Sequence, residues 1–420
     1  MAAQLLPYYE RFMASPWLQL LLWTGISVIL WKFSSKAPHD LLVYGALIYA
    51  ILHAQHSWHA WAQPAGWAFI VVGAYGLLSL PLSCHPLMSC RDFGKSFDLL
   101  AGLFALSVLF NTRPRVEAAL FYSAAAVLLI LTFDLGRLAW ALGPNLMAKA
   151  HVYEPFILNH SNVASMMAGL AALMFFRQAW HWRHRLWPAL ACGAAVLVCL
   201  IYQVVVASRG PQIAFALTVV SLGLLIPSWR GKAAWFAAVL VLGIGIVYQA
   251  HHINPRFMEK QSMSNLSERD KVWTHTWSLV KERPWLGHGY GKRNFEAVYY
   301  SSAPPRSKFH YPHPHQFWLK LAFESGALGV MIHLTAWLLL AAGLIRACFR
   351  ESTFEARLLP GTIGLMLLFI HIYGLGDYPD NVVQQAQFWL IPLALTVCAL
   401  PITGCQVGEV HGFRRSGSNR

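Results

Sequence analysis

Apolar stretches separated by short polar connections make up most of the chain. The hydrocarbon core of a bilayer is about 30 Å thick, so a helix needs about 20 mostly apolar residues to cross it. Twelve stretches approach this length, and we predict an all-α polytopic membrane protein with about twelve transmembrane helices. The predicted spans cover residues 16–33, 38–53, 65–82, 96–111, 116–135, 157–176, 186–207, 211–227, 232–250, 326–348, 358–376 and 383–403.

One long polar insertion, His251–Pro314, interrupts this series of spans. We predict an amphipathic helix within it, from about residue 268 to 281, which Pro284 stops. Its apolar side is expected against other helices or the lipid boundary. The residues at helical spacing are Trp273, Trp277 and Val280. The predicted organisation is therefore nine spans in residues 1–250, the loop in 251–314, and three spans with a tail in 315–420.

The distribution of Lys and Arg orients the predicted spans. Short cytoplasmic connections are enriched in these residues, and an inside N-terminus gives fourteen inside cations against seven outside. We therefore expect both termini in the cytoplasm and the long loop on the outer face. The inside set is Arg11, Arg113, Arg115, Arg177, Arg183, Arg185, Arg230, Lys232, Arg346, Arg350, Arg357, Arg414, Arg415 and Arg420. The outside set is Lys32, Lys36, Arg91, Lys95, Arg137, Lys149 and Arg209.

Composition supports the membrane assignment and narrows the partners. The chain is 57% hydrophobic and only 12% charged, whereas soluble domains average about 25% charged residues. Its net charge of +14 comes without any nucleic-acid-binding module, so we expect membrane lipids or a phosphorylated substrate as the partner, and no nucleic acid. No secretory signal peptide is evident at the N-terminus. Cys84 and Cys90 share one short outer connection, where a disulfide and two free thiols both remain open.

Candidate chemistry gathers on the predicted outer face. His310, His313 and His315 lie in a proline-containing stretch that leads into an apolar helix. Arg209 is held in the short connection between the seventh and eighth spans, and Arg269 opens the loop helix. Arginine grips phosphate oxygens in pairs and stays charged, while histidine exchanges protons near neutral pH. Further polar residues at the same face are His160, Asn162 and Asp377.

Other interpretations of these motifs compete with a catalytic one. The three histidines could bind zinc, but no acidic or cysteine ligand lies at helical spacing beside them, and we predict no metal or other cofactor. Arg209 could instead reach lipid headgroups, and Arg269 could pair with a neighbouring carboxylate. The glycine run LGHGYGKRNF follows a helix and not a strand, which favours a turn over a nucleotide site. Lys320 and Glu324 are four residues apart and are expected to form a structural ion pair.

Three motifs in fixed order resemble the O-antigen ligase and polymerase superfamily of bacterial membrane glycosyltransferases. They are SRG at 208–210, SERDKVWTHTWSLVKERPWLGHGYGKRNF at 267–295 and HQFWLKLAFESGALG at 315–329. The resemblance covers most of the chain from about Leu158 onward and implies a GT-C-like fold in the inner membrane. In that family the histidine of the third motif acts on the acceptor, which maps onto His315, with His313 as the alternative. Arg209 and Arg269 map onto residues proposed to hold the lipid diphosphate, and Asp377 matches a late acidic position. The family commonly has asparagine where this chain has Gln316.

The resemblance implies a metal-independent, inverting transferase. It would move a preassembled glycan from undecaprenyl diphosphate to a hydroxyl of the lipid A-core oligosaccharide, on the periplasmic face. Within the same superfamily, an O-antigen polymerase and a protein O-oligosaccharyltransferase remain alternatives. A lipid-linked glycan flippase or other transporter is the alternative from another class, and it would need no histidine beside paired arginines.

Overall fold

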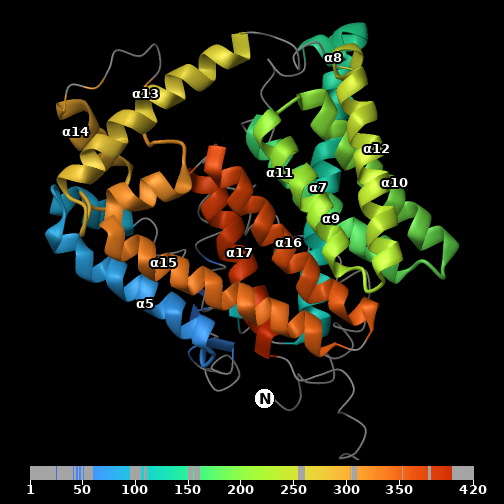
Figure 1. Ribbon diagram of the computed structural model, residues 1–420, viewed down its shortest axis with the longest axis horizontal. Helices are drawn as coiled ribbons and strands as arrows, with labels where there is room; N and C mark the ends of the chain where they lie inside the picture. Colours follow the sequence, from blue (N-terminus) through green and yellow to red (C-terminus); the bar gives the residue numbers. More distant parts are fainter. Residues whose placement is uncertain are drawn as a thin grey trace, which may run out of the picture.

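The computed structural model describes seven ranges of the chain, together with a few isolated positions. The described ranges are 60–94, 112–149, 161–253, 261–302, 310–351, 353–376 and 380–399. Every regular element within them is a helix, and they contain no strand (Figure 1). This part of the chain therefore has the all-α fold that the apolar pattern predicts.

Six described helices are long and apolar enough to cross a membrane. They are α5 with η1 (Pro64–Leu82), α7 with η2 (Arg113–Asn145), α9 (Ser161–His181), α10 (Leu186–Val206), α15 (Phe317–Arg350) and α16 (Phe354–Gly376). Two apolar segments are shorter, namely α11 with η4 (Arg209–Leu225) and the second half of α17 (Asp380–Ala399). The structure thus confirms a polytopic helical membrane protein.

The predicted spans match these helices wherever the structure describes them. α12 (Trp229–Ile253) covers the predicted span 232–250. The spans predicted at 16–33, 38–53 and 96–111 lie largely outside the described residues, so the total of about twelve stays a prediction. α15 begins nine residues before its predicted span because helical turns lie on both sides of a break at Gly326, where φ is 63°.

The helix ends form two groups, at opposite ends of the bundle. At the first, which we call the site end, Ser208 before α11 donates a hydrogen bond to Asn162 near the start of α9. At the other, Arg183 after α9 forms an ion pair with Glu355 in the first turn of α16. α16 has 23 residues, and a rise of 1.5 Å per residue separates the two ends by about 35 Å.

α9 is the central helix of the bundle. It packs against α7, α10, α11 and α16, and most of its residues are buried. Small residues make this possible because they let neighbouring backbones approach closely. A Cβ atom at Gly169 would lie 2.9 Å from both the Gln203 side chain and the Phe369 ring. The sequence of α9 therefore fixes how closely α10 and α16 approach it.

Two helices of the long insertion pack on the start of α15. α13 (Gln261–Glu282) ends next to the predicted boundary but begins seven residues earlier, and α14 (Lys292–Ser301) was not predicted. Figure 1 shows both helices beside the first part of α15, which in turn lies along α5. Of the predicted apolar side of α13, Val280 is buried against these helices, whereas Trp277 remains 51% exposed. The buried cluster beneath comprises Val272, Leu279, Val280, Phe295, Tyr299, Tyr311 and Phe323.

Candidate functional site

His313 and His315 form a pair immediately before α15. Their ring centroids are 4.2 Å apart, and the His315 backbone N–H donates a hydrogen bond of 3.3 Å to Nδ1 of His313. His313 is buried, whereas His315 is partly exposed and has a φ of 55°. Positive φ is uncommon for residues other than glycine and concentrates at functional sites. His313 therefore positions the backbone of its neighbour, and His315 presents the more accessible imidazole.

His310 does not join this pair. Its Nε2 lies 2.9 Å from Glu296 Oε1, and its ring stacks on Tyr300 of α14 at a centroid distance of 5.0 Å. The three histidines that are close in sequence therefore separate into a pair and a single residue. Within the described ranges, no group of three His, Cys, Asp or Glu residues is arranged to hold a metal ion.

α15 begins directly after the pair because Gln316 caps it. The Gln316 side chain accepts a hydrogen bond from the Leu319 backbone N–H. An N-cap side chain satisfies one of the free N–H groups in the first helical turn. Gln316 stands where the O-antigen ligase and polymerase superfamily commonly has asparagine, and here its side chain caps the start of α15.

α13 ties the histidine pair to the end of α16. Nε1 of Trp273 donates a hydrogen bond of 2.8 Å to the Pro314 carbonyl, between the two histidines. One turn earlier on the same helix, Nη1 of Arg269 donates a bond of 2.7 Å to the Gly376 carbonyl. Arg269 thus contacts the last residue of α16.

Arg209 enters the same region from another direction. α10 ends at Ala207, which has a left-handed φ of 49°, and α11 starts at Arg209. A Cβ atom at Gly210 would contact the Tyr373 ring at 3.4 Å, so this turn packs against the last turn of α16. Asn162, in the first turn of α9, accepts a hydrogen bond from the Ser208 hydroxyl and so ties this turn to α9.

The structure therefore brings five of the seven sequence-predicted site residues to one end of the bundle. The turn of Arg209 packs against Tyr373, and Arg269 bonds to Gly376. These two contacts lie within one turn of α16. Trp273 links Arg269 to the histidine pair through α13. His160 and Asp377 lie outside the described residues. The five are Asn162, Arg209, Arg269, His313 and His315.

The glycine run of the insertion forms a turn at 287–291, as its position after a helix predicted, and we call this turn the docking loop because it bonds to α15. Backbone N–H groups of His288 and Gly289 donate to the carbonyls of Phe323 and Glu324, at 2.7 and 3.0 Å. Gly287 has a φ of 70°, and a Cβ atom there would lie 2.6 Å from the Phe323 carbonyl oxygen. The glycines therefore admit close contact with protein backbone at the break in α15.

Glu324 is a residue whose role the sequence only partly revealed. The predicted ion pair with Lys320 is confirmed, with Nζ 3.5 Å from Oε1, and both side chains are buried. The same oxygen also accepts the Gly291 backbone N–H at 3.0 Å. Spacing of four residues reveals the first contact, but nothing in the sequence links Glu324 to a position 33 residues earlier.

The connection after α5 forms the floor beneath the docking loop. His288 donates from Nε2 to the Leu279 carbonyl at 2.7 Å, and its Nδ1 lies 3.5 Å from Cys84 Sγ. Burial lowers the pKa of His288, and the bond to the Leu279 carbonyl partly opposes this shift. Cys84 and Cys90 are both free thiols, and Cys84 accepts a hydrogen bond from Arg283.

Comparison with known proteins shows similarity in the region that contains these motifs. Residues 194–334 match the family model described as O-antigen ligase. This range contains Arg209, all of α13 and α14, the docking loop and the histidine pair. A protein named O-antigen ligase from Pseudomonas aeruginosa is 22% identical over 391 residues, which are 91% of this chain and 90% of the relative. By both comparisons the chain is similar to O-antigen ligases.

The similarity to the Pseudomonas aeruginosa protein extends beyond the residues that the family model matches. The relative aligns over nearly the whole of both chains, so the likeness includes helices before residue 194. The matched range holds four of the five residues gathered at the site end, namely Arg209, Arg269, His313 and His315. Asn162 lies before it, on the central helix.

Proposed function

We propose that this protein is an O-antigen ligase that transfers a preassembled glycan from undecaprenyl diphosphate to a hydroxyl of the lipid A-core oligosaccharide. The carrying observation is that α13 contacts both the end of α16, through Arg269, and the histidine loop, through Trp273. Two residues one helical turn apart on α13 thereby hold the end of α16 and the loop that carries the partly exposed imidazole of His315. The family match and the relative named O-antigen ligase support the assignment.

His315 acts as the base in this proposal. The oxygen of the acceptor hydroxyl attacks the anomeric carbon of the glycan, and its proton passes to the imidazole of His315. The bond between that carbon and the diphosphate oxygen breaks, so undecaprenyl diphosphate leaves and the anomeric configuration inverts. His315 is preferred to His313 because it is the more exposed ring, while His313 accepts the His315 N–H.

Arg209 and Arg269 bind the diphosphate. Negative charge grows on the leaving oxygen as the glycosidic bond breaks, and fixed cations stabilise this charge in the transition state. Guanidinium groups suit the purpose because their planar donors match phosphate oxygens. Asn162 holds the turn of Arg209 through the Ser208 hydroxyl. His160 and Asp377 complete the proposed substrate-binding set, and the chemistry requires neither a metal nor another cofactor.

The proposed setting is the bacterial inner membrane, with the site end on the periplasmic face and both termini in the cytoplasm. The two-to-one excess of Lys and Arg in the predicted inside connections supports this orientation. It places the lipid-linked donor and the lipid A-core acceptor in the same leaflet. A GT-C-like arrangement with about twelve spans belongs to the same proposal.

The test uses purified protein with lipid-linked glycan and lipid A-core in the presence of EDTA. Ligated product is expected from the wild-type protein and from the control His310→Ala, whose imidazole pairs with Glu296. His315→Ala is expected to lose at least about 100-fold in rate, the usual contribution of a general base. Equal product from His315→Ala contradicts the assigned role, and loss in His313→Ala alone moves the base to that residue.

The acceptor decides between the ligase and its alternatives. A polymerase would extend a second lipid-linked glycan, and a protein O-oligosaccharyltransferase would modify a peptide hydroxyl. A flippase would move the donor across a vesicle membrane without any covalent product. Transfer to lipid A-core alone, among these acceptors, supports the ligase.

A further inference from the structure

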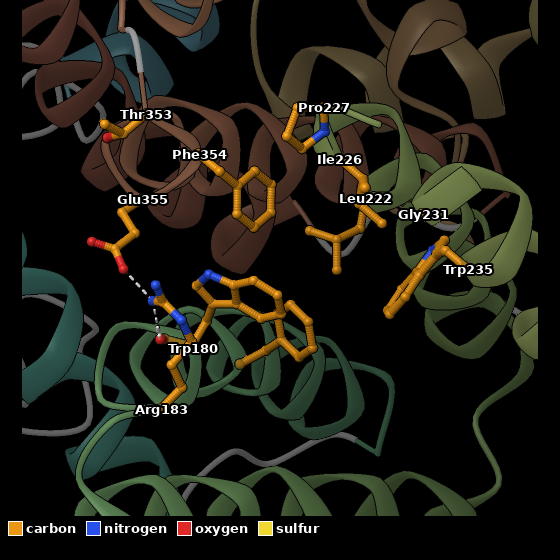
Figure 2. Close-up of a pocket in the computed structure, with 11 residues that line it drawn as sticks. Trp180, Arg183, Leu222, Ile226, Pro227, Gly231, Trp235, Thr353, Phe354 and Glu355 are labelled. Atoms are coloured by element: carbon orange, nitrogen blue, oxygen red, sulfur yellow. Dashed lines mark hydrogen bonds and ion pairs between the residues drawn. The ribbon is translucent and has the colours of Figure 1, made fainter. Parts of the chain in front are cut away.

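A cavity of about 670 Å³ lies at the end of the bundle opposite to the histidine pair. The last two turns of α9, the end of α11 with the segment after it, the first two turns of α12 and the start of α16 surround it (Figure 2). Its volume falls within the range of roughly 300–1,000 Å³ that is typical of small-molecule sites. The cavity is separated from Arg209 and Arg269 by nearly the whole length of α16.

The walls of this cavity are largely aromatic and aliphatic. Phe176 packs edge-on against Trp235 with ring centroids 6.0 Å apart, and Trp180 packs edge-on against Phe354 at 5.1 Å. Such walls in a membrane-spanning bundle favour hydrocarbon, and tryptophan is enriched where the hydrocarbon core meets the headgroups. An acyl chain is therefore the natural occupant of the apolar part. The remaining apolar lining residues are Leu222, Ile226 and Pro227.

One edge of the cavity carries both signs of charge. Arg183 and Glu355 form an ion pair there, and Arg183 Nη1 also donates to the Trp180 carbonyl at 3.1 Å (Figure 2). The side chains are 36% and 46% exposed, so both charges are open to a headgroup. The hydroxyl-bearing Thr353 lines the same edge.

The charges around this end favour a phosphate group. Ten Lys and Arg residues stand there against three Glu residues, counted over the described helix ends alone. Such clusters attract lipid phosphates at the membrane surface. The cations are Arg113, Arg115, Arg177, Arg183, Arg185, Arg230, Lys232, Arg346, Arg350 and Arg357, and the acids are Glu117, Glu351 and Glu355.

We propose that this cavity binds a phospholipid whose headgroup carries a primary ammonium beside its phosphate, as in phosphatidylethanolamine. An acyl chain fills the aromatic cavity, the phosphate lies at Arg183, and the ammonium lies at Glu355. Phosphatidylglycerol lacks a cation for Glu355, and the methylated ammonium of phosphatidylcholine cannot donate a hydrogen bond to it. The lipid thus occupies the leaflet opposite to the transfer site and is no substrate of the reaction.

The experiment places the full-length protein in nanodiscs of equimolar phosphatidylethanolamine and phosphatidylglycerol. Lipids retained after transfer to detergent are measured by native mass spectrometry. Wild-type protein is expected to retain phosphatidylethanolamine preferentially, and Glu355→Gln is expected to lower that preference about two- to fivefold, the effect an exposed charge pair supports. Arg183→Gln should weaken retention of both lipids, while the control Arg185→Gln, which removes a charge outside the cavity, should weaken it much less.

Two results would overturn the proposal. One is a wild-type protein that retains phosphatidylglycerol as well as phosphatidylethanolamine. The other is unchanged retention in Ile226→Trp, which fills the cavity without altering any charge. A second measurement on the wild-type protein alone, with phosphatidylcholine replacing phosphatidylglycerol, guards against variants that fail to fold. Equal retention of these two lipids also contradicts the ammonium contact with Glu355.

Discussion

Removing the carboxylate of Glu324 tests whether the docking loop is held at the break in α15 as the structure indicates. Glu324 and Lys320 are only 6% and 7% exposed, and Oε1 of Glu324 serves both Lys320 Nζ and the Gly291 N–H. Glu324→Ala removes the carboxylate from a buried ammonium and from a buried N–H at once. Breaking a buried ion pair on one side costs about 3–5 kcal/mol.

Two further variants separate the charge from the hydrogen bond. Glu324→Gln keeps an oxygen for the Gly291 N–H and for Lys320 Nζ but removes the negative charge, so it should lose less stability than Glu324→Ala. The double variant Lys320→Met/Glu324→Leu removes both charges and should be more stable than Glu324→Ala, although the Gly291 N–H still loses its acceptor. The expected order of stability is therefore wild type, then Glu324→Gln or the double variant, then Glu324→Ala.

The free energy of unfolding is measured by denaturant titration in mixed micelles, with tryptophan fluorescence as the signal. The reasoning is refuted if Glu324→Ala lies within about 1 kcal/mol of the wild type, because a buried pair cannot then be present. It also fails if the double variant is no more stable than Glu324→Ala. Unfolding of the wild type at high salt serves as a control, since screening acts weakly on buried charges.

Three further predictions concern α13 and the docking loop. Gly287→Ala should destabilise the protein by about 2–4 kcal/mol, because its Cβ meets a backbone carbonyl at positive φ, whereas Gly193→Ala, with open space around it, should cost nothing in the same thermal unfolding assay. Trp273→Phe should lower the transfer rate about 10- to 100-fold with little change in folding, since it frees the histidine loop, and the exposed Trp277→Phe should match the wild type. Stability should fall as pH drops through about 6.5, because burial lowers the pKa of His288 and the unfolded chain takes up the proton first. Unfolding titrations at several pH values should show this slope, and His288→Phe should flatten it.

The transmembrane helices were predictable because their signal is local. Each described span follows from the apolar length that a bilayer requires, and Pro284 correctly marks the end of α13. α14 escaped prediction because it is short and polar overall. The spacing of Phe295, Val298 and Tyr299, which pack toward the buried cluster, was the available signal.

The candidate site was predictable only as a set of residues. Orientation and motif order placed Arg209, Arg269 and His315 on one face, but the contacts that hold them there join residues far apart in the chain. Arg269 reaches Gly376 across 107 positions, and Trp273 reaches Pro314 across 41. The separation of His310 from the pair depends on Glu296 in the helix that was missed. The chemistry of each side chain could be inferred from the sequence, but the residues that each one contacts could be identified only from the fold.

The burial of α9 has a consequence for how the chain enters the membrane. α9 has a mean hydropathy of only 1.2 over its best window, the lowest of the six span-length helices, while the following α10 reaches 2.4. A helix that is surrounded by other helices needs little lipid affinity, so small residues are tolerated there at the expense of hydrophobicity. We therefore expect the insertion machinery to hold α9 poorly by itself, and to retain it only once α10 has emerged as its partner. Biogenesis of this protein would then depend on the synthesis of helix pairs and not of single spans.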